Sequence, residues 1–138
     1  MKTVNYEWEL GREKLVIQTG SYFYTGGLYI ALYQKDNDEI GELFCDLTIN
    51  LPGYSLEPNV AFIDGSSSKD KLAFIEQYRL GKILPKKGHS GMGEYAMVAF
   101  DLDRLGEFDK KGIAEYKRSW GMEQMDVSIP KSTKEKRR

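Results

Sequence analysis

The first half of the chain alternates between apolar and polar residues, a pattern that predicts β-strands. Near the N-terminus every second residue is apolar, namely Val4, Tyr6, Trp8 and Leu10, which is typical of a strand with one buried face. The run at 28–34 is apolar on both faces and therefore predicts a central strand. The strands predicted in this half cover residues 4–10, 14–19, 21–25, 28–34, 40–51 and 60–64, with a turn at 11–13.

The second half of the chain changes to helical spacing. A helix is predicted over 69–80, with Ser67 and Asp70 as a variant capping box and Gly81 as the C-terminal stop. Residues 82–94 are rich in Gly and Lys and are expected to form a loop. The remaining predicted elements are a strand at 95–100, a short turn capped by Asp101 or Asp103, and a helix at 110–120 capped by Asp109.

Strands followed by helices predict the α+β class. We expect a mostly antiparallel sheet of about six strands with two helices packed on one face. The 138 residues suit one domain. We place this single α+β domain at residues 1–121 and expect residues 122–138 to be a flexible basic tail.

Charge is distributed unevenly along the chain, although the formal net charge is only -1. The last eight residues carry a net charge of +4, which leaves -5 for residues 1–130. A mildly acidic body is therefore followed by a basic end, whose cations are candidate phosphate contacts. These cations are Lys131, Lys134, Lys136, Arg137 and Arg138.

Residue counts exclude several classes of protein. One Cys and one His exclude a disulfide scaffold, a multi-cysteine zinc site and a His-rich metal site, so we expect no metal and no cofactor. No apolar run approaches the ~20 residues of a membrane helix, and no secretory signal is present. The expected location is cytoplasmic, without membrane contact, and Cys45 is expected to be a small core residue.

The Gly- and Lys-rich segment is the first candidate binding site. Glycines that expose backbone N–H groups, together with two lysines, are the chemistry of an anion cradle. A nucleotide-binding loop would follow a strand and precede a helix, and this segment has the opposite order. A generic binding loop and a plain connection both remain open. The candidate residues are Lys86, Lys87, Gly88, His89, Ser90, Gly91 and Gly93.

His89 has a side chain that titrates near neutral pH and is a candidate general base. Ser90 is adjacent in sequence, which is a poor position for a proton relay, and the chain has no Gly-x-Ser-x-Gly nucleophile motif. We therefore assign no catalytic residue. A small enzyme or ligand-binding domain that uses His89 with a carboxylate such as Glu94 is the third-ranked function.

The three consecutive aromatic residues Tyr22, Phe23 and Tyr24 form the second candidate site. On a strand they point to both faces, so at least one is expected to face solvent or a partner. Exposed aromatic residues suit protein interfaces and also base stacking, and the acidic body disfavours base stacking. The segment 36–39 is expected to be a hairpin turn rather than part of a calcium loop.

A series of short segments in order along residues 43–121 carries a family resemblance. The segments are 47–51, 61–64, 74–75, 80–82, the loop at 88–91, the strand with Tyr95 and Phe100, and the helix with Tyr116. In this order they resemble a family of small proteins of phages and conjugative elements of Gram-positive bacteria, described only as a domain of unknown function. The resemblance implies no catalytic residues.

The resemblance implies a context, because small proteins of mobile elements are often accessory factors that inhibit restriction or CRISPR nucleases by binding them. The leading expectation is therefore a non-enzymatic protein-binding factor whose partner is a host or element-encoded protein. The alternative is a nucleic-acid-binding accessory protein that uses the basic tail and the 82–93 loop. The oligomeric state stays open.

Overall fold

The computed structural model describes residues 1–122 of the chain. The candidate phosphate contacts in the basic tail, from Lys131 to Arg138, lie outside the described residues. The predicted flexibility of the tail and the predicted domain boundary therefore stay predictions.

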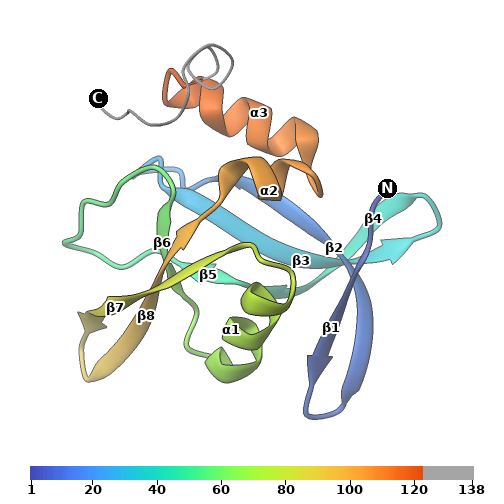
Figure 1. Ribbon diagram of the computed structural model, residues 1–138, viewed down its shortest axis with the longest axis horizontal. Helices are drawn as coiled ribbons and strands as arrows, with labels where there is room; N and C mark the ends of the chain where they lie inside the picture. Colours follow the sequence, from blue (N-terminus) through green and yellow to red (C-terminus); the bar gives the residue numbers. More distant parts are fainter. Residues whose placement is uncertain (123–138) are drawn as a thin grey trace.

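The N-terminal half folds into an antiparallel sheet of four strands in the order β1-β2-β3-β4 (Figure 1). Its strands are β1 (Val4–Trp8), β2 (Gly11–Ser21), β3 (Leu28–Asp36) and β4 (Glu39–Asp46). Apolar residues of β1 alternate toward the core, as the sequence pattern predicts, and Val4 and Tyr6 are buried. Strand β2 instead buries the three consecutive residues Leu15, Val16 and Ile17. The predicted turn at 36–39 is confirmed, because β3 ends at Asp36 and β4 begins at Glu39.

A second antiparallel sheet of four strands has the order β5-β6-β8-β7. Its strands are β5 (Thr48–Ile49), β6 (Val60–Ile63), β7 (Gly81–Ser90) and β8 (Gly93–Phe100). The prediction of one sheet with about six strands is therefore wrong in its architecture, although the α+β class and the antiparallel pairing are confirmed.

The predicted single strand at 40–51 is wrong because the chain changes sheets at Leu47. The Leu47 N–H donates to the Ile30 carbonyl in β3 at 2.9 Å, and the Leu47 carbonyl accepts the Asp64 N–H beyond β6 at 3.0 Å. One residue is thus bonded to both sheets. Alternation continues through this point, so the hydrophobic pattern contains no sign that the pairing partner changes.

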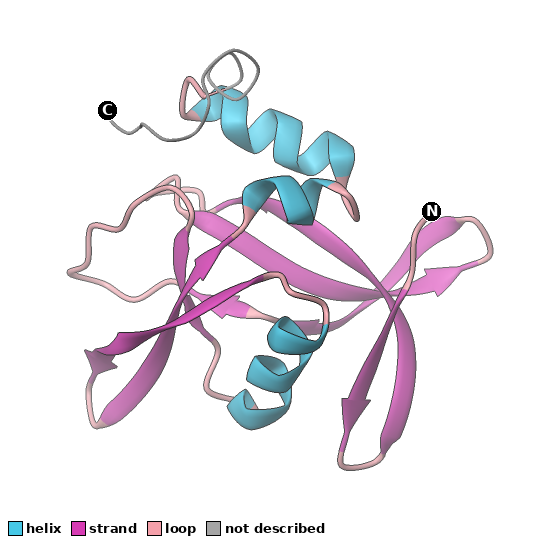
Figure 2. Ribbon diagram, in the orientation of Figure 1, coloured by secondary structure: helices cyan, strands magenta, loops and turns pink. Residues whose placement is uncertain are grey.

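Three helices cover the sheets from different sides, where two helices on one face were predicted (Figure 2). The helices are α1 (Ser68–Gln77), α2 (Leu102–Gly106) and α3 (Lys110–Ser119). Helix α3 packs on β2 and α2, whereas α1 contacts β1, β6 and β7. One main core takes side chains from both sheets and from every helix, including Phe74, Leu105 and Tyr116.

The helix caps only partly follow the sequence prediction. Asp101 and Asp109 are N-caps, and they accept the backbone N–H groups of Arg104 and Gly112 at 3.0 and 3.1 Å. The prediction of a capping box at α1 is wrong, because Ser67 has φ 52° and its side chain makes no capping hydrogen bond.

The predicted C-terminal stop of α1 is also wrong. Helix α1 ends at Gln77, and Arg79 takes the left-handed conformation that glycine usually supplies, with φ 55°. Gly81 instead begins β7, where a Cβ atom would lie 2.7 Å from the Ala99 carbonyl oxygen. Close packing against β8 therefore requires this glycine.

The predicted boundaries also differ from the structure at β2 and at the β7–β8 hairpin. Strand β2 is continuous from Gly11 to Ser21, so the predicted turn at 11–13 and the predicted strand at 21–25 are both wrong. The predicted loop at 82–94 is also wrong, because β7 and β8 form a hairpin there.

Replacement of Asp109 tests the attachment of α3 to the first sheet. Besides the cap, Asp109 Oδ2 accepts the Thr19 N–H at 2.8 Å and the Thr19 hydroxyl at 2.9 Å. Asp109→Ala is expected to lower the free energy of unfolding by about 2–3 kcal/mol, measured by urea denaturation. The control is Asp101→Ala, which removes a cap without a bond to β2 and is expected to cost about 1 kcal/mol. Equal losses would contradict a role for the Thr19 bonds.

Candidate binding cleft beside the β2–β3 turn

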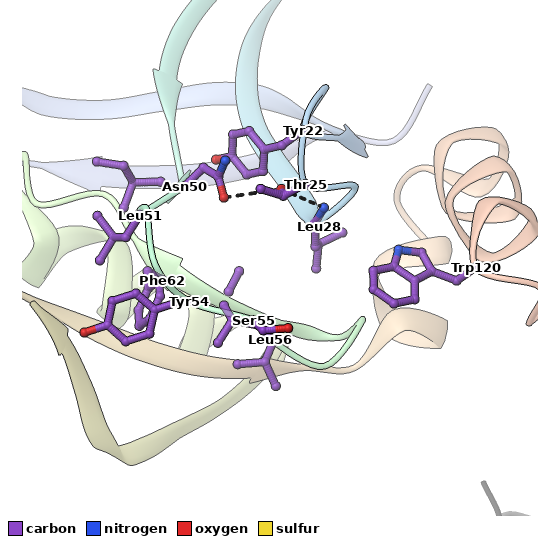
Figure 3. A pocket seen from close by; sticks show the side chains of 14 residues that line it. Tyr22, Thr25, Leu28, Asn50, Leu51, Tyr54, Ser55, Leu56, Phe62 and Trp120 are labelled. Carbon is purple, nitrogen blue, oxygen red and sulfur yellow. Dashed lines mark hydrogen bonds between the residues drawn. The ribbon is translucent and has the colours of Figure 1, made fainter. Parts of the chain in front are cut away.

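A cleft with a volume of about 290 Å³ opens between the β2–β3 turn and the segment that follows β5 (Figure 3). Tyr22, Thr25 and Leu28 lie on one side, and Tyr54 and Phe62 lie on the other. The fourteen lining residues include no charged side chain. The cleft therefore suits an apolar or aromatic group rather than an ion.

The β2–β3 turn is held in place by Tyr22. Its backbone closes the turn, with the Tyr22 N–H on the Gly27 carbonyl and the Gly26 N–H on the Tyr22 carbonyl, both at 2.9 Å. Its ring meets Tyr29 edge-on, and its hydroxyl shares a hydrogen bond of 2.8 Å with the Thr48 hydroxyl. Burial raises the pKa of Tyr22 to about 12, so this hydroxyl stays protonated at neutral pH.

The next two residues of the turn point outward. Phe23 is 90% exposed and Tyr24 is 92% exposed, and their rings contact each other edge-on at 4.9 Å. The three aromatic residues thus lie on a turn and not on the predicted strand, with Tyr22 directed inward. The use of this group as an interface stays a prediction.

Trp120 closes one end of the cleft and was not among the candidate site residues. Its indole Nε1–H donates to the Gly26 carbonyl at 3.0 Å, which joins the end of α3 to the β2–β3 turn. Trp120 and Phe23 also line a shallow hollow next to the cleft. Trp120 is the C-cap of α3 and is 39% exposed, and its ring centroid lies 6.4 Å from that of Tyr116. We call Phe23, Tyr24 and Trp120 the aromatic face.

The opposite side of the cleft is fixed by Tyr54. Its ring lies edge-on to Phe62 at 4.7 Å, and its hydroxyl accepts the His89 N–H at 2.8 Å. The segment after β5 is therefore connected to the tip of the β7–β8 hairpin. Through this bond one wall of the cleft contacts the Gly- and Lys-rich segment, which was predicted from the sequence as a separate candidate site.

The candidate Gly- and Lys-rich segment is a hairpin with ordinary structural roles for its glycines. Gly88 is buried, and a Cβ atom there would overlap the ring of Phe62. Gly91 has φ 60° and forms the turn between β7 and β8, and Gly93 begins β8. The hairpin ladder uses this backbone, so the residues do not form the predicted loop.

The lysines of this hairpin lie on an edge strand. Lys82, Lys86 and Lys87 are exposed on β7, which is the outer strand of the second sheet. Pro85 and a register shift between Ile83 and Lys87 interrupt the same edge. Lysine, proline and a bulge are the usual features that protect an exposed edge from pairing with another chain.

His89 is exposed and pairs with Glu94 across the hairpin. Among the described residues no hydrogen bond or ion pair joins the two side chains. Ser90 pairs with Gly93 and follows His89 on the strand, so the two side chains point to opposite faces. The arrangement brings His89 near a carboxylate but not near a nucleophile.

Other reactive groups lie inside the fold. Cys45 is half-buried against the main core, as predicted, and burial raises the pKa of its thiol to about 11. The buried Lys71 pairs with Asp64 at 3.0 Å. Within residues 1–122, no group of three or more His, Cys, Asp or Glu side chains is arranged to hold a metal ion. No helix in this part of the chain has the length and apolar character needed to cross a membrane.

A family model described as a domain of unknown function, DUF4313, matches residues 16–120. The chain belongs to this family. The DUF4313 match runs from β2 to Trp120 and thus includes both sides of the cleft and the aromatic face. The expected resemblance to a domain of unknown function is confirmed at this level. No curated protein and no solved structure matches the chain significantly.

Replacement of Tyr54 tests the link between the cleft and the hairpin. Tyr54→Phe keeps the ring on Phe62 and removes the acceptor of the His89 N–H. We expect exchange of the His89 amide hydrogen to become about five-fold faster, equivalent to about 1 kcal/mol, in NMR exchange measurements. Tyr24→Phe is the control, because the Tyr24 side chain is 92% exposed and its ring contacts Phe23 on the β2–β3 turn. An unchanged rate in Tyr54→Phe would contradict the link.

Proposed function

We propose that this DUF4313 protein is a non-enzymatic protein-binding factor whose contact surface is the aromatic face. The observation that carries the proposal is the exposure of Phe23 and Tyr24, at 90% and 92%, beside an uncharged cleft. Large aromatic side chains dominate the binding energy of protein interfaces. Burial of one such ring contributes about 1.5–3 kcal/mol.

The rigidity of the surrounding structure supports the same function. Tyr22 anchors the turn to β5 through Thr48, and Trp120 bonds to the turn from α3. A surface that is fixed before binding loses little conformational entropy when a partner docks. The aromatic face is therefore a better contact surface than a mobile loop with the same residues would be.

The most specific form of the proposal is an accessory factor of a mobile genetic element that inhibits a host defence nuclease of the CRISPR or restriction type. The family resemblance of the sequence supports this context. The net charge of -5 over residues 1–130 also supports it, because nucleases present basic surfaces to nucleic acid. Among the described residues, the exposed His89 has a carboxylate, Glu94, opposite it but no nucleophile beside it, which supports a role in binding rather than in catalysis.

Removal of the exposed rings tests the proposed surface. The double variant Phe23→Ser with Tyr24→Ser is expected to weaken partner binding about 100-fold or more, since two interface aromatics contribute about 3 kcal/mol together. Quantitative capture from a lysate of the source cells, followed by titration and a nuclease assay with the captured protein, measures this effect. The free energy of unfolding is expected to change by less than about 0.5 kcal/mol.

Met92→Ser is the matched control for this test. Met92 is fully exposed at the tip of the β7–β8 hairpin, away from the aromatic face. Its replacement removes a similar exposed apolar side chain and is expected to leave binding unchanged. Equal weakening by both variants, or none by either, would count against the aromatic face.

A second candidate function is nucleic-acid binding by the β7 edge, favoured by the exposure of Lys82, Lys86 and Lys87 on one strand. Their joint replacement by Gln is expected to reduce the salt dependence of duplex binding by about 0.9 for each phosphate that the variant no longer neutralises. The matched control replaces Lys14, Lys35 and Lys69, which are also exposed, and makes the same change in charge. The same slope in both triple variants would exclude the β7 edge as the nucleic-acid contact.

A further inference from the structure

We propose that the partner of the aromatic face is a second copy of this chain, with Phe23 and Tyr24 of each copy inserted into the cleft of the other. This inference rests on the proposed function for the contact surface, and it names a second copy of the chain, in place of a foreign protein, as the partner of that surface. It also fixes the geometry of the contact as a symmetric dimer.

The surface contains both halves of a self-complementary contact. Phe23 and Tyr24 project from the turn, and the cleft opens beside the same turn, with Tyr22 and Thr25 in its wall. The projecting rings do not fill their own cleft, since each is at least 90% exposed. A two-fold dimer requires one patch that carries a projection and a matching hollow, because each copy offers the same patch to the other.

The chemistry of the cleft fits the rings that would enter it. Leu51, Leu56 and Phe62 provide apolar contacts in the cleft. Aromatic pairs prefer edge-on contact, which is the geometry of the Phe23–Tyr24 and Tyr54–Phe62 pairs. Asn50 and Ser55 lie in the same lining and offer polar atoms to the Tyr24 hydroxyl of the other copy. The volume of about 290 Å³ holds several water molecules, whose release favours apolar contact.

Charge favours a second copy at this face over any other. Two identical acidic bodies repel each other wherever their charged surfaces meet, for example at the exposed Asp36, Asp38 and Glu39 around the β3–β4 turn. The lining of the cleft and the aromatic face are both free of charge. Two copies can therefore approach there without placing like charges opposite one another.

Sedimentation velocity of the full chain over a range of concentrations tests the dimer. We expect the wild-type protein to dimerise and Phe23→Ser to weaken dimerisation about 100-fold, because each substitution acts twice in a symmetric contact and weakens it about tenfold each time. Met92→Ser is expected to dimerise as the wild type does. A wild-type protein that stays monomeric at about 1 mM would overturn the proposal.

Paired charges test whether the projection enters the cleft. Phe23→Asp places a carboxylate on the projection, and Ser55→Lys places an ammonium group in the exposed rim of the cleft. Each variant alone is expected to be monomeric, and an equimolar mixture is expected to form a heterodimer. In that heterodimer one contact keeps both wild-type partners and the other pairs Asp with Lys. A mixture that stays monomeric, or single variants that dimerise, would overturn the insertion.

The outcomes also separate this inference from the proposed function. If the wild type is monomeric and a captured foreign protein is lost on replacement of Phe23 and Tyr24, the face binds that protein, and only the dimer is overturned. If the wild type is monomeric and capture does not depend on these residues, both proposals fail.

Discussion

Leu47 and Thr48 are bonded to both sheets, and the arrangement of the two sheets depends on these bonds. The Leu47 backbone bonds to Ile30 in one sheet and to Asp64 at the other. The Thr48 hydroxyl accepts the Ile30 N–H at 3.1 Å and shares a hydrogen bond with Tyr22. Both residues are buried, so a loss of these bonds would leave polar groups unpaired in the core. The relative position of the sheets, and with it the width of the cleft, follows from this crossing.

The cleft lies where segments remote in sequence meet. One side comes from the β2–β3 turn, the other from the segment after β5 and from β6, and the end from α3. Each contributor is tied by a side chain to a different part of the fold: Tyr22 to β5, Tyr54 to the β7–β8 hairpin and Trp120 to the turn. The surface is uncharged although the chain is 30% charged, and this contrast makes it stand out.

Local signals in the sequence predicted local structure well. The hydrophobic pattern located β1, β3 and β6, and the acidic cap Asp109 located α3. Helix α2 was predicted as a short turn capped by Asp101 or Asp103, and Asp101 is its cap. Predictions failed where a distant partner decides the outcome. The sequence around Gly88 is compatible with an anion cradle and also with a strand. The structure shows that this position must be glycine because the ring of Phe62 packs against it. The sheet change at Leu47 and the bond of Trp120 to the β2–β3 turn likewise depend on residues far along the chain.

The bond between Trp120 and Gly26 joins residues that are 94 positions apart. Contacts of such long sequence separation form slowly, because closing the loop between the two residues costs conformational entropy. When the ribosome has synthesised both sheets, it has not yet added Trp120, the residue that completes the cleft. The nascent protein thus completes the cleft only after α3 has emerged and docked.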